Sequence, residues 1–194
     1  MKVLLGIGNP GGSYERTRHN IGYRVLDALA GSVSGRWRKD ERMRAEICAV
    51  EGALLVKPLT FVNRSGESAA AVLGACGAGP GELLVVCDDV YLPSGRLRLR
   101  PSGGDGGHNG LRSLIEKVGT EEFARLRVGV GAPEGGTDLA DHVLGPFRPE
   151  EEAAIGPALE IALKVCGAWI GQGFVPAREL LSRSLSNPKK EQDE

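Results

Sequence analysis

The sequence predicts an α/β fold: a single domain whose central mixed, mostly parallel β-sheet is flanked by helices on both sides. Short apolar runs without polar alternation indicate strands that are buried on both faces, as in parallel sheets. Segments with helical periodicity follow most of these runs, which favours parallel strands joined by helices. A tight turn at Glu51-Gly52 between two apolar runs adds an antiparallel hairpin. The chain of 194 residues is 41% hydrophobic and shows neither a repeat nor a linker, so one domain is expected.

Strands are predicted from patterns that differ between the centre and the edge of a sheet. Residues 2–7 and 82–87 are continuous apolar runs, typical of central strands. Residues 96–100 read Arg-Leu-Arg-Leu-Arg, and this period-two alternation indicates a strand with one polar face. The predicted strands are residues 2–7, 44–50, 53–57, 82–87, 96–100 and 125–130.

Helices are predicted where apolar residues recur three and four positions apart. The predicted helices are residues 20–30, 63–77, 109–117, 149–172 and 175–184. Gly31 is expected to end the first of them, and residues 132–148 are expected to be irregular. The domain is expected to span residues 1–186, and the polar residues 187–194 are expected to form a disordered tail.

Charge and cysteine content narrow the classes of protein. The net charge of −1 argues against a dedicated nucleic-acid-binding protein, although Arg96, Arg98 and Arg100 alternate and could form a local basic face. The four cysteines are widely spaced in apolar runs, which predicts reduced core thiols rather than a zinc site or disulfides. We find neither a signal-peptide pattern nor an apolar window of about 20 residues, so a cytoplasmic protein without membrane contact is expected.

Neutral amides and one histidine gather in three predicted loops. The loops are Gly6-Ile7-Gly8-Asn9-Pro10-Gly11 running on to Asn20, Lys57 to Gly66, and Gly106-Gly107-His108-Asn109-Gly110. The buried strand at 82–87 is followed directly by Asp88-Asp89. The candidate side chains are His19, Asp88, Asn9, Asn63 and Asn109. If the loops converge, one base, one carboxylate to orient it and several amides form a water-activating hydrolytic site without a serine or cysteine nucleophile.

Each motif also has an alternative interpretation. Gly6 to Gly11 matches the glycine pattern of dinucleotide-binding loops, but no helix is expected to start within it and no strand-end acid follows about 20 residues on. Asn63 and Asn109 stand where helix N-caps are expected. The arginine-rich strand face would most often be solvated. Two further histidines are interpreted as structural, namely His108 and His142.

Together, these segments resemble those of bacterial-type peptidyl-tRNA hydrolases. They occur in the order found in that family and cover nearly the whole chain. The matching segments are Gly6–Gly11 with Tyr14, Thr17–Gly22, Lys57–Gly66, Asp88-Asp89, Gly106–Leu111, Arg125–Gly131 and His142–Gly145. Several ordered motifs are far more specific than any one of them.

The resemblance implies a monomeric enzyme, with no cofactor, metal or obligate protein partner, that hydrolyses the ester between a peptide and the 3′-terminal ribose of tRNA. Such an enzyme recycles tRNA from stalled or aborted translation and binds peptidyl-tRNA through its acceptor end and phosphates. By motif, His19 is the catalytic base and Asp88 its partner. The implied substrate-binding residues are Asn9, Tyr14, Val62, Asn63 and Asn109. The positions that match tRNA phosphate contacts are Arg100 and Arg127.

Three positions depart from the family pattern. Val62 stands where methionine is usual, Tyr91 where an acid is common, and Asp105 puts a negative charge into the glycine-rich loop. None of these departures removes a catalytic group. The main alternative within the resemblance is an RNA-binding module without activity, as among plant organellar intron-splicing factors. The presence of the histidine, the aspartate and all three asparagines favours the enzyme.

Overall fold

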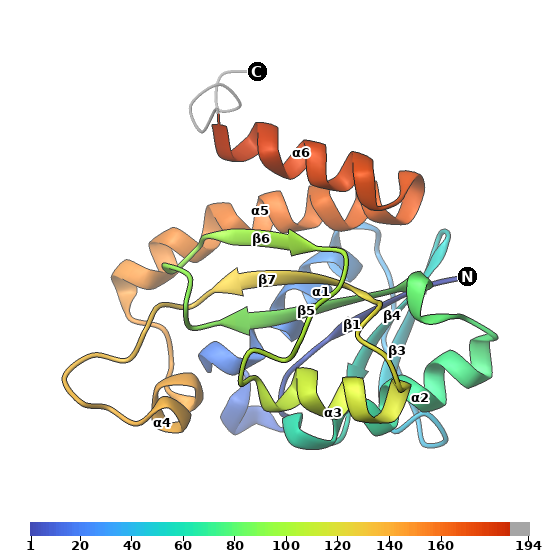
Figure 1. Cartoon of the computed structure of the whole chain (residues 1–194), viewed down its shortest axis with the longest axis horizontal. Coiled ribbons are helices and arrows are strands. Elements are labelled where there is room, and N and C mark those ends of the chain that lie inside the picture. Colours follow the sequence, from blue (N-terminus) through green and yellow to red (C-terminus); the bar gives the residue numbers. More distant parts are fainter. Residues whose placement is uncertain (187–194) are drawn as a thin grey trace.

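The computed structural model describes residues 1–186, so the tail predicted for residues 187–194 lies outside the described residues. Within residues 1–186, seven strands form one sheet in the order β2-β3-β4-β1-β5-β7-β6 (Figure 1). The strands are β1 (Lys2–Gly6), β2 (Arg38–Asp40), β3 (Ala45–Val50), β4 (Ala53–Pro58), β5 (Leu83–Asp89), β6 (Leu97–Arg100) and β7 (Ala124–Gly129). The four central strands β4, β1, β5 and β7 run parallel, and antiparallel strands complete both edges. The predicted mixed sheet is therefore confirmed, with its parallel part at the centre.

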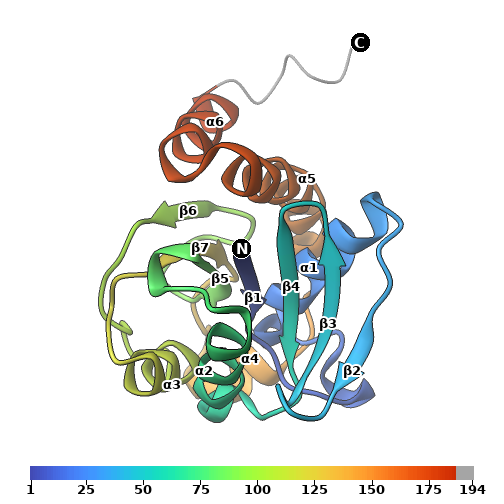
Figure 2. The same cartoon turned by 90° about the vertical axis from the view of Figure 1, so that its right-hand side faces the viewer.

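Helices cover both faces of this sheet, as predicted. The helices are α1 (Ile21–Ser32), α2 (Ser65–Cys76), α3 (Asn109–Val118), α4 (Leu139–Leu144), α5 (Pro149–Gln172) and α6 (Phe174–Ser186). The core has two layers because successive side chains of a buried strand point to opposite faces. Leu4 of β1 belongs to the core layer that also contains residues of α1, α5 and α6, whereas Val3 and Leu5 belong to the layer with residues of α2 and α3. Figure 2 shows these two groups of helices on opposite sides of the sheet.

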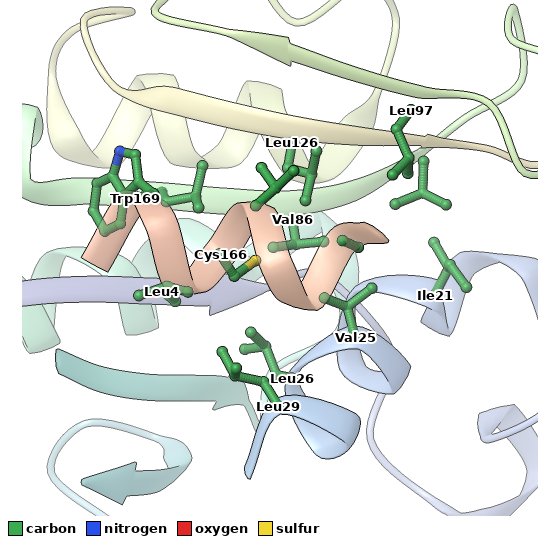
Figure 3. Packing of buried hydrophobic residues seen from close by; sticks show 14 of the residues in the cluster. Leu4, Ile21, Val25, Leu26, Leu29, Val86, Leu97, Leu126, Cys166 and Trp169 are labelled. Carbon is green, nitrogen blue, oxygen red and sulfur yellow. The ribbon is translucent and has the colours of Figure 1, made fainter. Parts of the chain in front are cut away.

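The larger core layer holds α1 and α5 against the parallel strands. Figure 3 shows Trp169 and Cys166 of α5 among strand side chains that include Leu4, Val86 and Leu126. Each of these five side chains is at most 2% exposed. Fully burying a large aliphatic side chain contributes about 1.5–3 kcal/mol. This packing holds α5 against the central strands.

Glycine allows α1 to approach the strands closely. A Cβ atom on Gly22 would lie 2.5 Å from the carbonyl oxygens of Ile7 and Val86. Helix α1 begins only at Ile21, so no α-helix starts within the glycine-rich segment Gly6–Gly11. A dinucleotide-binding loop would present a helix N-terminus to the pyrophosphate. The structure therefore does not support the dinucleotide-binding interpretation.

Several local features differ from the sequence prediction. Strand β2 was not predicted, because its three charged residues carry no apolar pattern. Helix α4 lies within residues 132–148, which were expected to be irregular. Helix α2 begins at Ser65, after the 3₁₀ turn η3 (Val62–Arg64), rather than at Asn63. Helix α1 continues one residue past Gly31.

Helix α5 corrects the expectation that no segment is apolar enough to span a membrane. Its 24 residues suffice by length and composition, and it is the one such helix within residues 1–186. In the structure, Ile155, Ala162 and Trp169 of α5 are buried in the core layer that α5 shares with α1 and the sheet. Helix α6 packs against α5 as well. Core packing therefore accounts for part of the apolar content of α5.

Candidate active site

His19 and Asp88 meet at the carboxyl ends of the central strands. His19 lies in the 3₁₀ turn η2 (Arg18–Asn20), which leads into α1, and Asp88 lies near the end of β5. His19 Nδ1 lies 2.7 Å from Asp88 Oδ1, and the two side chains are 13% and 3% exposed. The structure thus brings together the histidine and the carboxylate that the sequence singled out.

Each of these two groups changes the acidity of the other. Burial alone would raise the pKa of Asp88, but the charges of two nearby imidazoles and their hydrogen bonds hold that pKa well below its ordinary value. Burial would lower the pKa of His19, but the charge and hydrogen bond of Asp88 raise it above its ordinary value. Asp88 is therefore an ionised acceptor at neutral pH, and His19 Nδ1 carries the hydrogen that points to it. In the neutral imidazole this tautomer leaves His19 Nε2 with a free lone pair, as a general base requires.

His108 is the second imidazole that contacts Asp88. Its Nε2 lies 3.0 Å from the same Asp88 oxygen. Its Nδ1 accepts hydrogen bonds from the backbone N–H groups of Gly110 and Leu111, which makes His108 the N-cap of α3. The Nε2 atom therefore carries the hydrogen and donates it to Asp88. The structural interpretation of His108 is incomplete, because sequence spacing gave no sign of its contact with Asp88.

His19, Asp88 and His108 also form a candidate metal-binding cluster, since their ligand atoms lie within 4.8 Å of one another. A metal-bound imidazole normally donates its other N–H group to an acceptor. The other nitrogen of His108, however, accepts two backbone hydrogen bonds. Metal binding at Nε2 would require a histidine with no ring hydrogen at all. The donor set therefore does not fit a metal ion.

A cavity of about 470 Å³ opens beside His19. The polar residues of the predicted site that line it are His19, Asp88, Asn9, Asn63 and Asn109. Apolar side chains complete its walls, among them Phe61, Val62, Leu139, Val143 and Leu144. The cavity thus places amides and an imidazole next to an apolar surface. Its volume lies within the range of pockets that bind small molecules.

Asn9 is held firmly at the cavity wall. Its side-chain oxygen accepts a hydrogen bond of 3.0 Å from the backbone N–H of Val62. Its backbone exchanges two hydrogen bonds of 2.9 Å with the side chain of Asn20. Because the Asn9 oxygen is engaged, the NH₂ group is what remains to donate into the cavity. The sequence pointed to Asn9 but not to the supporting role of Asn20.

Asn63 and Asn109 do not cap helices. Arg64 occupies the N-cap position of α2, and His108 occupies that of α3. Both asparagines are exposed and line the cavity. The N-cap interpretation of these residues is therefore wrong, and their side chains are free to meet a ligand.

Comparison with known proteins gives one consistent match. The sequence model of the family described as Peptidyl-tRNA hydrolase matches residues 3–191. A peptidyl-tRNA hydrolase of Brevibacillus brevis is 43% identical over 182 residues, which are 90% of this chain and 94% of that protein. One of Synechocystis is 40% identical over 185 residues, covering 93% and 95% of the two chains. The crystal structure of peptidyl-tRNA hydrolase from Acinetobacter baumannii superposes with a TM-score of 0.87 at 32% identity and covers 93% of this chain and 94% of that one.

The chain belongs to the peptidyl-tRNA hydrolase family. The resemblance predicted from the ordered motifs is confirmed.

Two further residues that the peptidyl-tRNA hydrolase pattern assigns to the substrate are placed differently by the structure. Val62 is buried, lines the cavity and donates its N–H to Asn9. Tyr14 is not among the lining residues. Its ring lies edge-on to Phe61, with the ring centroids 6.3 Å apart. Tyr14 therefore contacts a residue that lines the cavity but does not line the cavity itself.

The two arginines that match phosphate contacts of peptidyl-tRNA hydrolases have different surroundings. Arg100 is exposed on β6 and forms no ion pair with any residue of the described part. Arg127 on β7 lines the cavity, and its Nε lies 3.0 Å from Asp89 Oδ2. Both side chains of this pair are largely buried, at 18% and 1% exposed. Only Arg100 is thus fully available to a ligand outside the cavity.

The two remaining departures from the family pattern lie on loops beside the cavity. Tyr91 is 75% exposed and lines the cavity, while its backbone N–H donates to Asp89. Asp105 accepts a hydrogen bond of 2.6 Å from the N–H of Gly107 and lies 3.5 Å from Arg112 Nε. The negative charge of Asp105 is therefore used in contacts with its own loop and with α3.

Arg125 supports the backbone of the second glycine-rich loop, residues 101–107. It is fully buried and donates to the carbonyl oxygens of Gly103, Gly104 and Glu121. Its guanidinium lies 4.5 Å from the ring centroid of Phe123. The two terminal NH₂ groups of its guanidinium are therefore used inside the protein.

Proposed function

We propose that the chain hydrolyses the ester bond between the peptide and the 3′-terminal ribose of peptidyl-tRNA, with His19 as general base. The observation that carries the proposal is the His19–Asp88 pair at a cavity walled by three asparagines. We further propose that it acts in the cytoplasm as a monomer, without an obligate protein partner, cofactor or metal ion.

The proposed reaction begins with a water molecule beside His19 Nε2. The imidazole takes a proton from this water, and the resulting hydroxide attacks the ester carbonyl. Asp88 stabilises the imidazolium that forms, because it is ionised and lies 2.7 Å from the other ring nitrogen. The proton then passes to the ribose oxygen as the ester bond breaks. No covalent enzyme intermediate is needed.

The carboxamides provide the polar contacts to substrate. The NH₂ group of Asn9 or of Asn63 would donate to the negative charge that grows on the carbonyl oxygen. One such donor typically contributes about 3–4 kcal/mol to stabilising the transition state. Asn109 can hold the water or the peptide backbone, since an amide both donates and accepts. Contacts to peptide amides rather than to side chains suit a substrate whose peptide sequence varies.

The tRNA is proposed to bind through its phosphates. Arg100 is exposed and unpaired within the described chain, as a phosphate contact requires. Arg127 would act at the cavity itself, where Asp89 orients its guanidinium. Contacts of this kind weaken as salt concentration rises, because binding releases counterions.

The test is hydrolysis of N-acetyl-aminoacyl-tRNA by the wild-type chain and by His19→Ala. General-base catalysis is typically worth about 10²–10⁴-fold, so the variant should lose at least about 100-fold in kcat with little change in KM. Glu15→Gln, at an exposed position in the same loop, is the matched control and should retain wild-type activity. Near-normal turnover by His19→Ala would remove His19 as the base, and failure of the wild-type chain to hydrolyse the ester would reject the function.

A further inference from the structure

The turn that carries His19 is tied to a segment far along the chain through Arg18. The Arg18 guanidinium donates to Glu151 Oε2 at 2.6 Å and to the carbonyl oxygen of His142 at 3.0 Å. The Arg18 backbone N–H donates to the carbonyl oxygen of Gly145 at 3.0 Å. Arg18, the residue directly before the proposed base, is therefore hydrogen-bonded to three residues between positions 142 and 151.

Glu151 is itself fixed in place. It lies in the first turn of α5, and its Oε2 also accepts a hydrogen bond of 2.6 Å from the backbone N–H of Arg148. The positive end of the helix dipole favours a carboxylate there. The side chains of Arg18 and Glu151 are only 8% and 7% exposed, so water does not compete for the contact.

Helix α4 overlaps the start of the segment 142–151 and forms one wall of the cavity. Arg18 donates to the carbonyl oxygen of His142 within α4 and to that of Gly145 directly after it. The residues of α4 that line the cavity are Leu139, Ala140, Val143 and Leu144. A helix of six residues is too short to be stable by itself. Its position must therefore come from tertiary contacts, and it packs against η2, the turn that carries His19.

We propose that Arg18 and Glu151 form a positioning pair that sets the α4 wall of the cavity relative to His19. The pair touches neither the water nor the ester. It determines where the substrate held against α4 lies with respect to Nε2 of the base. This inference rests on the proposed function of His19.

The chain offers a matched control pair. Arg24, further along α1, donates to both carboxylate oxygens of Glu152 at 2.9 Å. Arg18 and Arg24 both lie over the ring of Phe147, at 5.7 Å and 5.4 Å from its centroid. The Arg24–Glu152 pair thus links the N-terminal part of the chain to α5 as the Arg18–Glu151 pair does. Its hydrogen bonds, however, reach neither η2 nor α4 among residues 1–186.

The experiment compares kcat and KM for N-acetyl-aminoacyl-tRNA, together with melting temperature, in two sets of variants. The first set is Glu151→Gln, Arg18→Met and the double variant Arg18→Met with Glu151→Met. The second is Glu152→Gln and Arg24→Met. A buried ion pair replaced by apolar side chains of similar volume often keeps its stability. The double variant therefore separates folding from positioning, because methionine cannot donate to the carbonyl oxygen of His142.

We expect kcat/KM of the first set, including a stably folded double variant, to fall by at least about 10-fold, since a displacement near 1 Å at a reacting centre can cost about 100-fold. Part of that loss should be a raised KM. A smaller fraction of folded enzyme would lower the apparent kcat but leave KM unchanged. The second set should stay within about twofold of the wild type, because surface pairs contribute little.

Three results would overturn the proposal: wild-type kcat/KM in the double variant, losses in the first set with KM unchanged, or equal losses in both sets. Failure of the wild-type chain to hydrolyse the ester is a separate result, which would reject the proposed function instead.

Discussion

Replacing Asp88 with asparagine removes the negative charge beside His19 while keeping an oxygen that can accept both imidazole hydrogen bonds. His19 and His108 lie 2.7 Å and 3.0 Å from the same Asp88 oxygen. A carboxamide oxygen can occupy that place and keep the tautomer of His19. What the variant loses is the attraction between the carboxylate and the imidazolium that forms in the reaction.

The size of this loss follows from distance and burial. Two unit charges about 4 Å apart attract by about 4 kcal/mol at an effective dielectric constant of about 20, which sets an upper limit near 10³-fold in rate. Exchanging a charge-assisted hydrogen bond for a neutral one costs about 1 kcal/mol, which sets a lower limit near fivefold. We therefore expect kcat of Asp88→Asn to fall by roughly 5- to 1000-fold, and by less than in His19→Ala.

The assay is release of the acetylated amino acid from N-acetyl-aminoacyl-tRNA across about pH 5.5 to 8.5, which brackets the ordinary imidazole pKa of about 6.5. Asp88 raises the pKa of His19, so its removal should move the acid limb of the kcat profile to lower pH while the plateau falls. Glu160→Gln, an exposed carboxylate on α5, is the control for a distant loss of charge. Wild-type kcat with an unmoved acid limb in Asp88→Asn would refute the reasoning.

Three further predictions follow from the same contacts. Arg100→Ala should raise KM and reduce the slope of log KM against log salt concentration by about one. A wild-type slope in this variant would exclude a phosphate contact of Arg100. Arg98→Ala, on the same exposed face of β6, tests whether the neighbouring arginine contributes in the same way. Asn9→Ala should leave the buried N–H of Val62 without its acceptor and cost about 1–3 kcal/mol of stability, measured as a lower melting temperature, and an unchanged melting temperature would contradict the assigned bond. The pKa of Asp88 is depressed by folding, so its contribution to stability is present above the unfolded pKa of about 3.9 and is lost as pH falls through the folded pKa. Urea unfolding below about pH 5 should therefore show a weaker acid dependence in Asp88→Asn, and equal dependence in both proteins would contradict the shift.

Much of the fold was predictable from local pattern because its central strands and long helices carry unbroken periodicity. The apolar run at residues 82–87 became β5, and the hairpin around Glu51-Gly52 became β3 and β4. The short elements β2 and α4 were missed for the opposite reason. Their few residues have too little apolar periodicity, and packing against neighbouring elements holds them in place.

The sequence was enough to predict which residues form the candidate active site, but not which of them contact one another. His19 and Asp88 stood out as a loop histidine and a strand-end acid, and the family resemblance, rather than spacing, distinguished Asp88 from Asp89. The structure gives the physical reason for that choice. Neighbouring side chains on a strand point to opposite faces, so Asp88 meets His19 while Asp89 meets Arg127.

The contacts of His108 and Arg18 could not be predicted from the sequence. His108 reaches Asp88 only because α3 begins at that point of the fold, and its place before Asn109 suggested no more than a loop residue. Arg18 meets Glu151 across 133 positions of sequence. Pairs so far apart leave no periodic signal in a single sequence.

The most direct test of His19 as the base is a single-turnover measurement with enzyme in excess over N-acetyl-aminoacyl-tRNA, because the observed rate then reports the chemical step on bound substrate. We predict that His19→Ala binds the tRNA with wild-type affinity and hydrolyses it about 10²–10⁴-fold more slowly at saturation. A saturated single-turnover rate equal to that of the wild type would contradict the account.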